Sequence, residues 1–300
     1  MKLCTLFIIA VAFLLSTPNL LAQTTERAPR IAVLDFGNSA LGRQAADDLY
    51  AALNSEKKLS LLDREQSRTA ARGAGYAGTL NMTLAEARDL GAAIGCDFYI
   101  TGNAETLRRS ASNRPVYYES YAAIFLVSAR SGSLLRWVRP AFEASTPDAA
   151  EKPLRASLSK PSTLEWVIEE VLQAMQNERD ERARALDVSV PVIEEAPDEN
   201  SSAATDLQTP RPYRRLRPAY PESAARAEAE ATVDALADID EKGEVGLVRI
   251  VRWGGFGLDE ATKDTVRRLH FYPAMRNGQP VPLRVLLRYN FRKPLPEPKR

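Results

Sequence analysis

GGFGLDEATKDTVRRLHFYPAMRNGQPVP, residues 254–282, is the stretch that decides the fold, and strand patterns lie on both sides of it. Before it, Thr232–Asp240 alternates apolar with polar residues, and Val245–Trp253 is a second apolar run. The turn between them holds Gly243, which can supply a positive φ. The two runs therefore predict a β-hairpin.

Inside the stretch, Leu258–Leu269 has apolar residues on one helical face, with acidic residues in its first turn and basic residues at its end. Asn277-Gly278 predicts a turn. After it, Leu283–Arg292 alternates again and predicts a half-buried strand with a basic outer face. Tyr220-Pro221 opens a short helix ahead of the hairpin. The order predicts a small ββαβ domain at about residues 219–293.

This pattern resembles the C-terminal domain of the TonB family over about 75 residues. Four segments carry the resemblance in the right order: the start, the turn ending at Gly243, the GxGLDEA helix entry and the FxPAxxNGxPVP segment. The sequence departs from the family in a strand that carries two aspartates, in an Ala for a usual Gly and in a Leu for a usual Trp. The matching motif residues are Tyr220, Pro221, Gly257, Leu258, Pro273, Ala274, Gly278, Pro280, Val281 and Pro282, and the departures are Asp234, Asp238, Ala231 and Leu269.

The resemblance implies a module that captures an extended segment of an outer-membrane protein by β-strand addition. The last strand is the candidate edge. We expect its outward residues to bind the partner: Arg284, Leu286, Arg288, Asn290 and Arg292. The arginines would meet an acidic or polar peptide, or they would only keep an exposed edge from aggregating. The sequence leaves both interpretations open.

Composition argues against several classes of function. Forty Lys and Arg residues face thirty-nine Asp and Glu residues, so no overall charge favours nucleic acid. One histidine, His270, and two cysteines give no metal cluster at a known ligand spacing. No catalytic set or phosphate-binding loop can be argued, so we expect neither an enzyme nor a cofactor.

Residues 1–22 have the layout of a secretory signal peptide, with Lys2, an apolar run and a break before Ala22. Cleavage before Gln23 would release the protein into the periplasm of a Gram-negative-type cell. The apolar run is short for a spanning helix, but an uncleaved anchor in the inner membrane, facing the periplasm, is the alternative. The protein would otherwise reach a membrane only through its partners.

Residues 28–186 predict a mixed α/β, sandwich-like domain with the element order βαβααβββα. Its segments IAVLDFGN, LLDRE and LGAAIGCDFYITGN resemble the periplasmic domain of TolB N-terminal regions and of CsgG- and FlgO-type proteins. That resemblance implies non-enzymatic assembly at the envelope. Residues 187–218, rich in proline and acid, predict a flexible linker, and residues 294–300 a tail. The fold class is thus α+β, or mixed α/β.

Two functions follow from these patterns. The first is a TonB-family periplasmic protein that binds outer-membrane transporter or envelope segments and contributes to energy-dependent transport. The second is an assembly scaffold or adaptor without energy transduction. Cleavage of residues 1–22 would favour the second function, because a transducer needs an anchored N-terminus.

Overall fold

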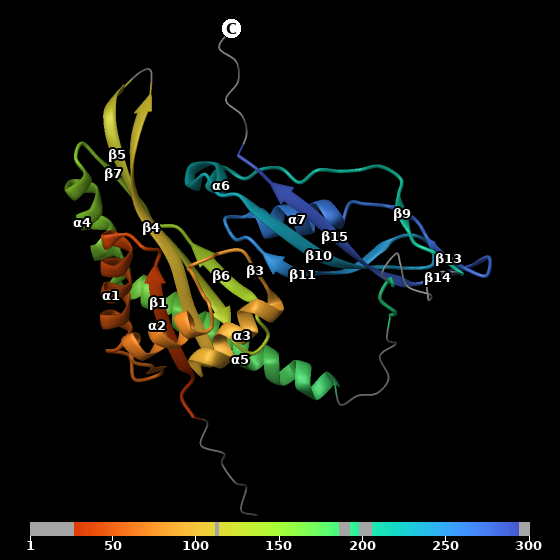
Figure 1. Ribbon diagram of the computed structural model, residues 1–300, viewed down its shortest axis with the longest axis horizontal. Helices are drawn as coiled ribbons and strands as arrows, with labels where there is room; N and C mark the ends of the chain where they lie inside the picture. The colour runs from red at the N-terminus through yellow and green to blue at the C-terminus, as the bar shows by residue number, and fades with distance from the viewer. Residues whose placement is uncertain (1–26, 112–113, 186–192, 198–205, 294–300) are drawn as a thin grey trace, which may run out of the picture.

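The computed structural model describes residues 27–111, 114–185, 193–197 and 206–293. The predicted signal peptide, residues 1–22, and the predicted tail, residues 294–300, lie outside them. Within the described residues, we find no helix that is long and apolar enough to cross a membrane. The fold is mixed α+β, as the sequence predicts (Figure 1).

A mixed sheet forms the centre of the N-terminal part, in the strand order β2-β1-β4-β5-β6 with β7 beside β5. β1 runs parallel to β2 and to β4, whereas the later strands pair antiparallel. The strands are β1 (Arg30–Phe36), β2 (Ser60–Leu61), β4 (Phe98–Ala111), β5 (Arg114–Ser128), β6 (Leu134–Val138) and β7 (Ala141–Ala144).

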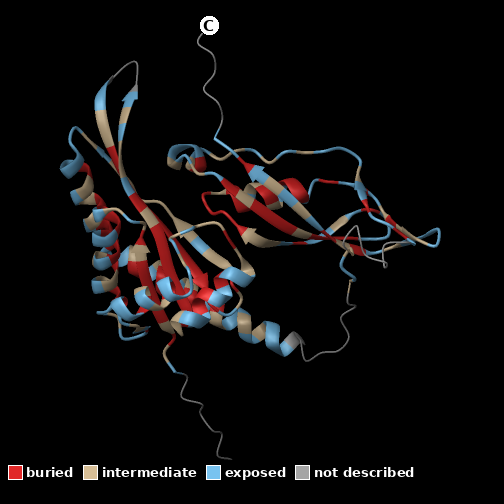
Figure 2. Cartoon of the chain, in the orientation of Figure 1, coloured by how far each residue is buried: buried red, intermediate tan, exposed pale blue. Residues whose placement is uncertain are grey.

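Helices cover both faces of this sheet. The core on one face contains residues of α1 (Ala40–Leu53), α4 (Pro147–Leu158) and α5 (Pro161–Ala185). The core on the other contains residues of α2 (Arg64–Gly73) and α3 (Leu84–Ile94). In Figure 2 the sheet is buried where the helices cover it, while the far end of the β4–β5 hairpin is exposed. Sequence patterns explain these positions, since α1 and α3 turn their apolar residues inward.

The C-terminal sheet has the order β15-β10-β11-β3. Its strands are β10 (Ala231–Ile239), β11 (Val245–Trp253), β15 (Leu283–Phe291) and β3 (Met82–Thr83). β3 comes from the N-terminal part and pairs with β11 through Met82–Trp253 and Thr83–Arg252. The apolar residues that alternate along β10 are buried, as predicted. They face α7 (Leu258–Val266) and the core around it. The short helix α6 (Glu222–Ala227) precedes β10.

Short strands extend the C-terminal part at the end away from α6 (Figure 1). β13 (Ala274–Arg276) and β14 (Gln279–Val281) form a hairpin around Asn277-Gly278, and β8 (Leu207–Gln208) pairs with β13. β12 (Phe271–Tyr272) pairs with β9 (Arg211–Pro212). Two of these strands lie within residues 187–218, so part of the span predicted as a linker is paired with the C-terminal domain. The domain boundaries stay a prediction.

One apolar cluster joins the two parts of the chain. Phe125 of β5 stacks on Trp253 of β11 with 6.1 Å between the ring centroids, and it contacts Phe256 edge-on at 5.3 Å. The indole N–H of Trp253 donates to the carbonyl of Gly132 at 3.0 Å. Because these rings are buried together with apolar residues of α3 and β10, the N-terminal and C-terminal parts share a core.

Asn81, in the loop before β3, fixes this contact with its side chain. Its amide nitrogen donates to the carbonyls of Thr232 and Trp253 at 2.7 Å each, and its oxygen accepts from the Thr232 N–H at 3.0 Å. One side chain thus bonds to the backbones of both β10 and β11. It holds the N-terminal part in register with the C-terminal sheet.

Candidate functional site

The candidate site is the outer edge of β15, the one predicted from the sequence. In the sheet β15-β10-β11-β3, β15 forms one edge, and on the other side β3 pairs with β11 only at Arg252 and Trp253. β15 pairs with β10 along its whole length, from Leu283 opposite Ile239 to Phe291 opposite Ala231. Its other side is therefore the edge at which an added strand can pair.

Side chains of β15 alternate between the core and the outer face of the sheet. Leu283, Val285 and Phe291 are buried, whereas Leu286 is 53% exposed and Arg288 and Asn290 are exposed. The structure thus brings the predicted partner-binding residues 284, 286, 288 and 290 to one face, as the period of two requires. Arg292 follows the end of the strand and is exposed. That these residues bind a partner stays a prediction.

Two aspartates that depart from the family pattern pair with two of these arginines. Arg288 lies opposite Asp234 and bonds to both its carboxylate oxygens, at 2.7 and 2.9 Å. Arg284 lies opposite Asp238 and makes the same two-pronged contact. The hydrogen bonds to these carboxylates raise the pKa of both guanidinium groups. The buried charges of Asp234 and Asp238 are therefore compensated within the sheet.

The backbone groups of β15 also alternate. The N–H and C=O of Arg284 point away from β10, because both bond to residues of the segment 193–197. Successive residues of a strand turn these groups to opposite sides, so Leu286, Arg288 and Asn290 point theirs the same way. Within the described part of the chain, β15 has no strand partner beyond Arg284 on this side. The edge thus offers donors and acceptors at three alternate residues.

The motif residues form the framework of the domain, not its edge. The Tyr220 hydroxyl donates to the carbonyls of Ala224 and Ala229, at 3.3 and 2.7 Å, and closes α6. Gly257 has φ +80, and a Cβ there would lie 3.3 Å from Pro221. Leu258 and Ala274 are fully buried.

The remaining motif residues surround the β13–β14 hairpin. Gly278 has φ +79, which the turn requires, and Pro280 and Val281 pair with β13. Pro273 and Pro282 flank the two strands. Pro282 directly precedes β15 and offers no N–H at that point. These residues therefore set where the last strand begins.

A buried carboxylate closes the turn between β11 and α7. Asp259 is 6% exposed, and its oxygens accept the N–H groups of Gly254 and Gly255 at 2.9 Å each. Burial raises its pKa to about 6, although these two hydrogen bonds act in the opposite direction. Asp259 holds the backbone beside the shared core, so its function is structural.

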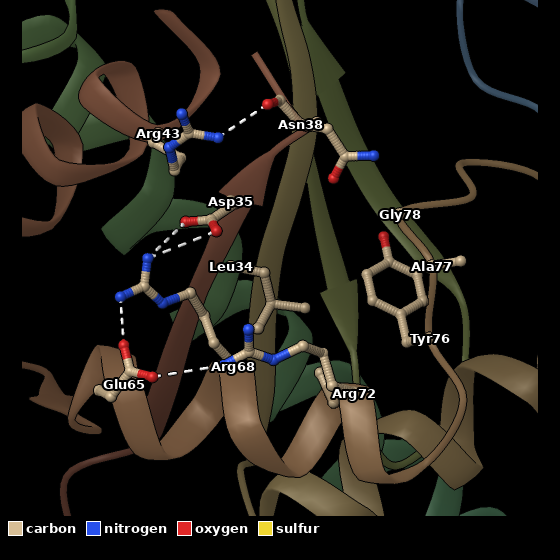
Figure 3. A pocket seen from close by; sticks show the side chains of 12 residues that line it. Leu34, Asp35, Asn38, Arg43, Glu65, Arg68, Arg72, Tyr76, Ala77 and Gly78 are labelled. Carbon is tan, nitrogen blue, oxygen red and sulfur yellow. Dashed lines mark hydrogen bonds and ion pairs between the residues drawn. The ribbon is translucent and has the colours of Figure 1, made fainter. Parts of the chain in front are cut away.

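A separate cavity of 520 Å³ lies beyond the carboxyl end of β1 (Figure 3). Arg68 extends across it and pairs with Glu65 and Asp35, and Arg72 also contacts Glu65. Arg43 donates to the carbonyl of Asn38 at 2.7 Å. Because its acids and bases mostly pair with one another, we assign no ligand to this cavity.

Sequence reasoning missed the residues that connect the two parts, above all Asn81, Met82 and Trp253. A run of glycines after Trp253 was the only local signal, since close approach of another segment requires small residues there. A Cβ at Gly255 would lie 2.0 Å from the Phe125 ring.

Comparison with known proteins gives one family match. The sequence model described as "Gram-negative bacterial TonB protein C-terminal" matches residues 217–292. No curated protein matches the chain.

Solved structures add weak similarities. The C-terminal domain of TonB from Pseudomonas aeruginosa is 21% identical, with 34% of this chain and 95% of that one covered and a TM-score of 0.25. The LpoB C-terminal domain from Salmonella enterica is 17% identical, with 41% and 87% covered and a TM-score of 0.27. Lipoprotein GNA1162 from Neisseria meningitidis is 14% identical, with 50% and 99% covered and a TM-score of 0.30. All three scores are low, so the assignment depends on the family model.

Proposed function

We propose that residues 217–292, which form a TonB C-terminal domain, bind an extended segment of a cell-envelope protein by strand addition at β15. The observation that carries this proposal is the row of outward backbone groups on β15, at Leu286, Arg288 and Asn290, which have no strand partner among the described residues. Backbone hydrogen bonds would supply affinity, and the alternating side chains would set the register. The partner would be a segment of an outer-membrane transporter.

The protein would act in the periplasm of a Gram-negative-type cell. Whether it contributes to energy-dependent transport depends on residues 1–22. N-terminal sequencing of the protein from fractionated cells decides this. A chain that begins at Gln23 in the soluble periplasm would exclude an anchored transducer. A chain that keeps Met1 in the inner membrane would favour one.

A second candidate function is an envelope adaptor or scaffold without energy transduction. The shared core favours it, because Trp253 and Phe256 pack against Phe125 of the N-terminal part. A domain fixed to a larger body in this way presents its edge at a constant orientation. No mobile arm is then needed to position this edge for a partner.

The decisive experiment crosslinks the edge in living cells. A photoreactive amino acid at Asn290 should crosslink to one envelope protein, at residues in an extended segment. Leu286→Pro should abolish this crosslink, because it removes an outward N–H without removing a bond to β10. Leu286→Ala is the matched control, which keeps the N–H and should keep the crosslink. A crosslink that survives Leu286→Pro would refute strand addition at β15.

A further inference from the structure

A segment of the chain itself already pairs with the β15 edge. The Arg284 N–H donates to the carbonyl of Glu194, and the Ala196 N–H donates to the carbonyl of Arg284, both at 2.8 Å. These two bonds form a parallel bridge in which Glu195 lies opposite Arg284. The segment 193–197 thus occupies the edge as an added strand would, for one residue of its length.

Side chains of this segment match the charges around the edge. The Glu194 carboxylate lies 3.0 Å from the Arg276 guanidinium, and this contact lowers the pKa of Glu194. Glu195 lies 4.0 Å from Arg284, and Ala196 packs against the core of the C-terminal sheet. Among the described residues, Glu194 is the acid that pairs with Arg276, so removing the segment would leave that arginine uncompensated.

The pairing is short for a structural reason. One step upstream of Arg284, the next outward residue of the edge is Pro282, which has no N–H to donate. One step downstream, Leu286 is 53% exposed, and no described residue of the segment bonds to it. Among the described residues, the segment therefore fills the first position of the edge and pairs with none of the following three.

We propose that the segment Ile193–Pro197 is an internal competitor for the β15 edge, and that the edge accepts an acidic, extended segment in parallel orientation. This inference rests on the proposed function, because it names the chemistry of the partner and its regulation. A partner strand that covers the whole edge displaces the segment and takes over its contact with Arg276. A tethered competitor acts at an effective concentration on the order of millimolar, so only a tight or multivalent partner displaces it.

The first test needs no partner. Amide hydrogen exchange of the full chain is measured by NMR for the wild type, Ala196→Pro and Ala196→Ser. Ala196→Pro removes the donor to Arg284, whereas Ala196→Ser keeps it. We expect the Arg284 amide to exchange about tenfold faster in Ala196→Pro than in the other two proteins. Equal exchange in all three would overturn the internal pairing.

The second test uses a synthetic peptide with the sequence of residues 190–199, VPVIEEAPDE, labelled for fluorescence anisotropy. It should bind Ala196→Pro at least about threefold more tightly than the wild type or Ala196→Ser, because the tethered copy no longer competes. A peptide with glutamine at both glutamates should bind more weakly to Ala196→Pro, and Arg276→Gln should reduce that difference. Equal binding of all peptides would overturn the preference for acid.

The two proposals fail in different ways. If the Arg284 amide is slow in the wild type and fast in Ala196→Pro, but no Asn290 crosslink forms in cells, the proposed function fails and the internal pairing stands. If the crosslink forms and depends on Leu286 but exchange at Arg284 is the same in all variants, the competitor is overturned and strand addition stands.

Discussion

Replacing Gly255 with alanine tests the shared core of the two parts. Gly255 has φ +65, and a Cβ there would lie 2.0 Å from Cε1 of Phe125. Phe125 is fully buried between Trp253 and Phe256, so its ring has little room to move. The substitution therefore has two costs. Alanine must adopt a left-handed backbone conformation, and its Cβ clashes with Phe125 of β5.

Gly278 provides the matched control. It has φ +79 in the β13–β14 turn, but a Cβ there would meet nothing within 4 Å. Left-handed alanine costs roughly 1–2 kcal/mol at either site. Overpacking adds about 1–3 kcal/mol, and only at Gly255. We therefore expect Gly255→Ala to lower the free energy of unfolding by about 1–3 kcal/mol more than Gly278→Ala.

Urea unfolding followed by tryptophan fluorescence measures both variants. Of the three tryptophans, Trp253 lies in the shared core, Trp137 packs against it and Trp166 packs against the other core, so part of the emission reports on the contact between the two parts. A larger decrease in the midpoint for Gly255→Ala, with a red shift of the native emission, is the expected result. Equal midpoints for the two alanine variants would refute a packed contact between Phe125 and the Gly255 loop.

Three further predictions use the same unfolding assay. Asn81→Asp should lower the free energy of unfolding by about 2–3 kcal/mol, because the Asn81 amide donates to two strand carbonyls and a carboxylate has no N–H to donate. A loss of stability smaller than that of a surface Asn→Asp control would contradict this. Arg288→Met should lower the free energy of unfolding by about 1–2 kcal/mol. The loss is smaller than for a fully buried ion pair, because Arg288 is half exposed and Arg252 stays 3.5 Å from Asp234. Adding Asp234→Leu should recover part of this loss, because it removes the buried carboxylate. The pKa of Asp259 is about 6 in the folded state against 3.8 for the free group, so ionisation of the buried carboxyl at neutral pH costs up to about 3 kcal/mol of folding free energy. The wild type should therefore gain stability relative to Asp259→Asn as pH falls from about 7 to 4, and parallel pH curves for the two proteins would argue against this.

Sequence patterns predicted the elements that bury one face of a regular strand or helix. β11 has the bounds that its apolar run predicts, and β15 ends at Phe291, one residue before the predicted limit. A capping box of Thr83 and Glu86 forms at the start of α3, where the local sequence is enough to determine it. Such elements are predictable because local hydrogen bonds and one-sided burial determine them together.

Elements that depend on distant partners were not predictable. β3 has two residues, too few for any periodicity, and its partner lies in β11, which is remote in sequence. α4 contains Pro153 inside a helix, which argues against a helix by local rules. β4 runs to Ala111, well past its apolar first half, because β5 pairs with its polar outer half.

The candidate site was predictable only in part. Alternation placed Arg284 and Arg288 on the outer face, but their pairing with Asp238 and Asp234 depends on the register between β10 and β15. A one-residue shift in that register would separate all four charges. The bridge at Glu195 has no sequence signal either, because an isolated pair in a proline-rich span shows no periodicity.

These contacts divide the positive charges of the edge between two functions. Arg284 and Arg288 bond to the buried aspartates of β10, so changing them alters the stability of the sheet before it alters any partner. Arg276 pairs with Glu194 of the displaceable segment, and the two side chains are 37% and 53% exposed. Charge selectivity toward a partner strand should therefore depend on Arg276, at the start of the edge. A charge scan that found the reverse, with Arg288 controlling affinity at unchanged stability, would place the partner on the outer face of the sheet and not along its edge.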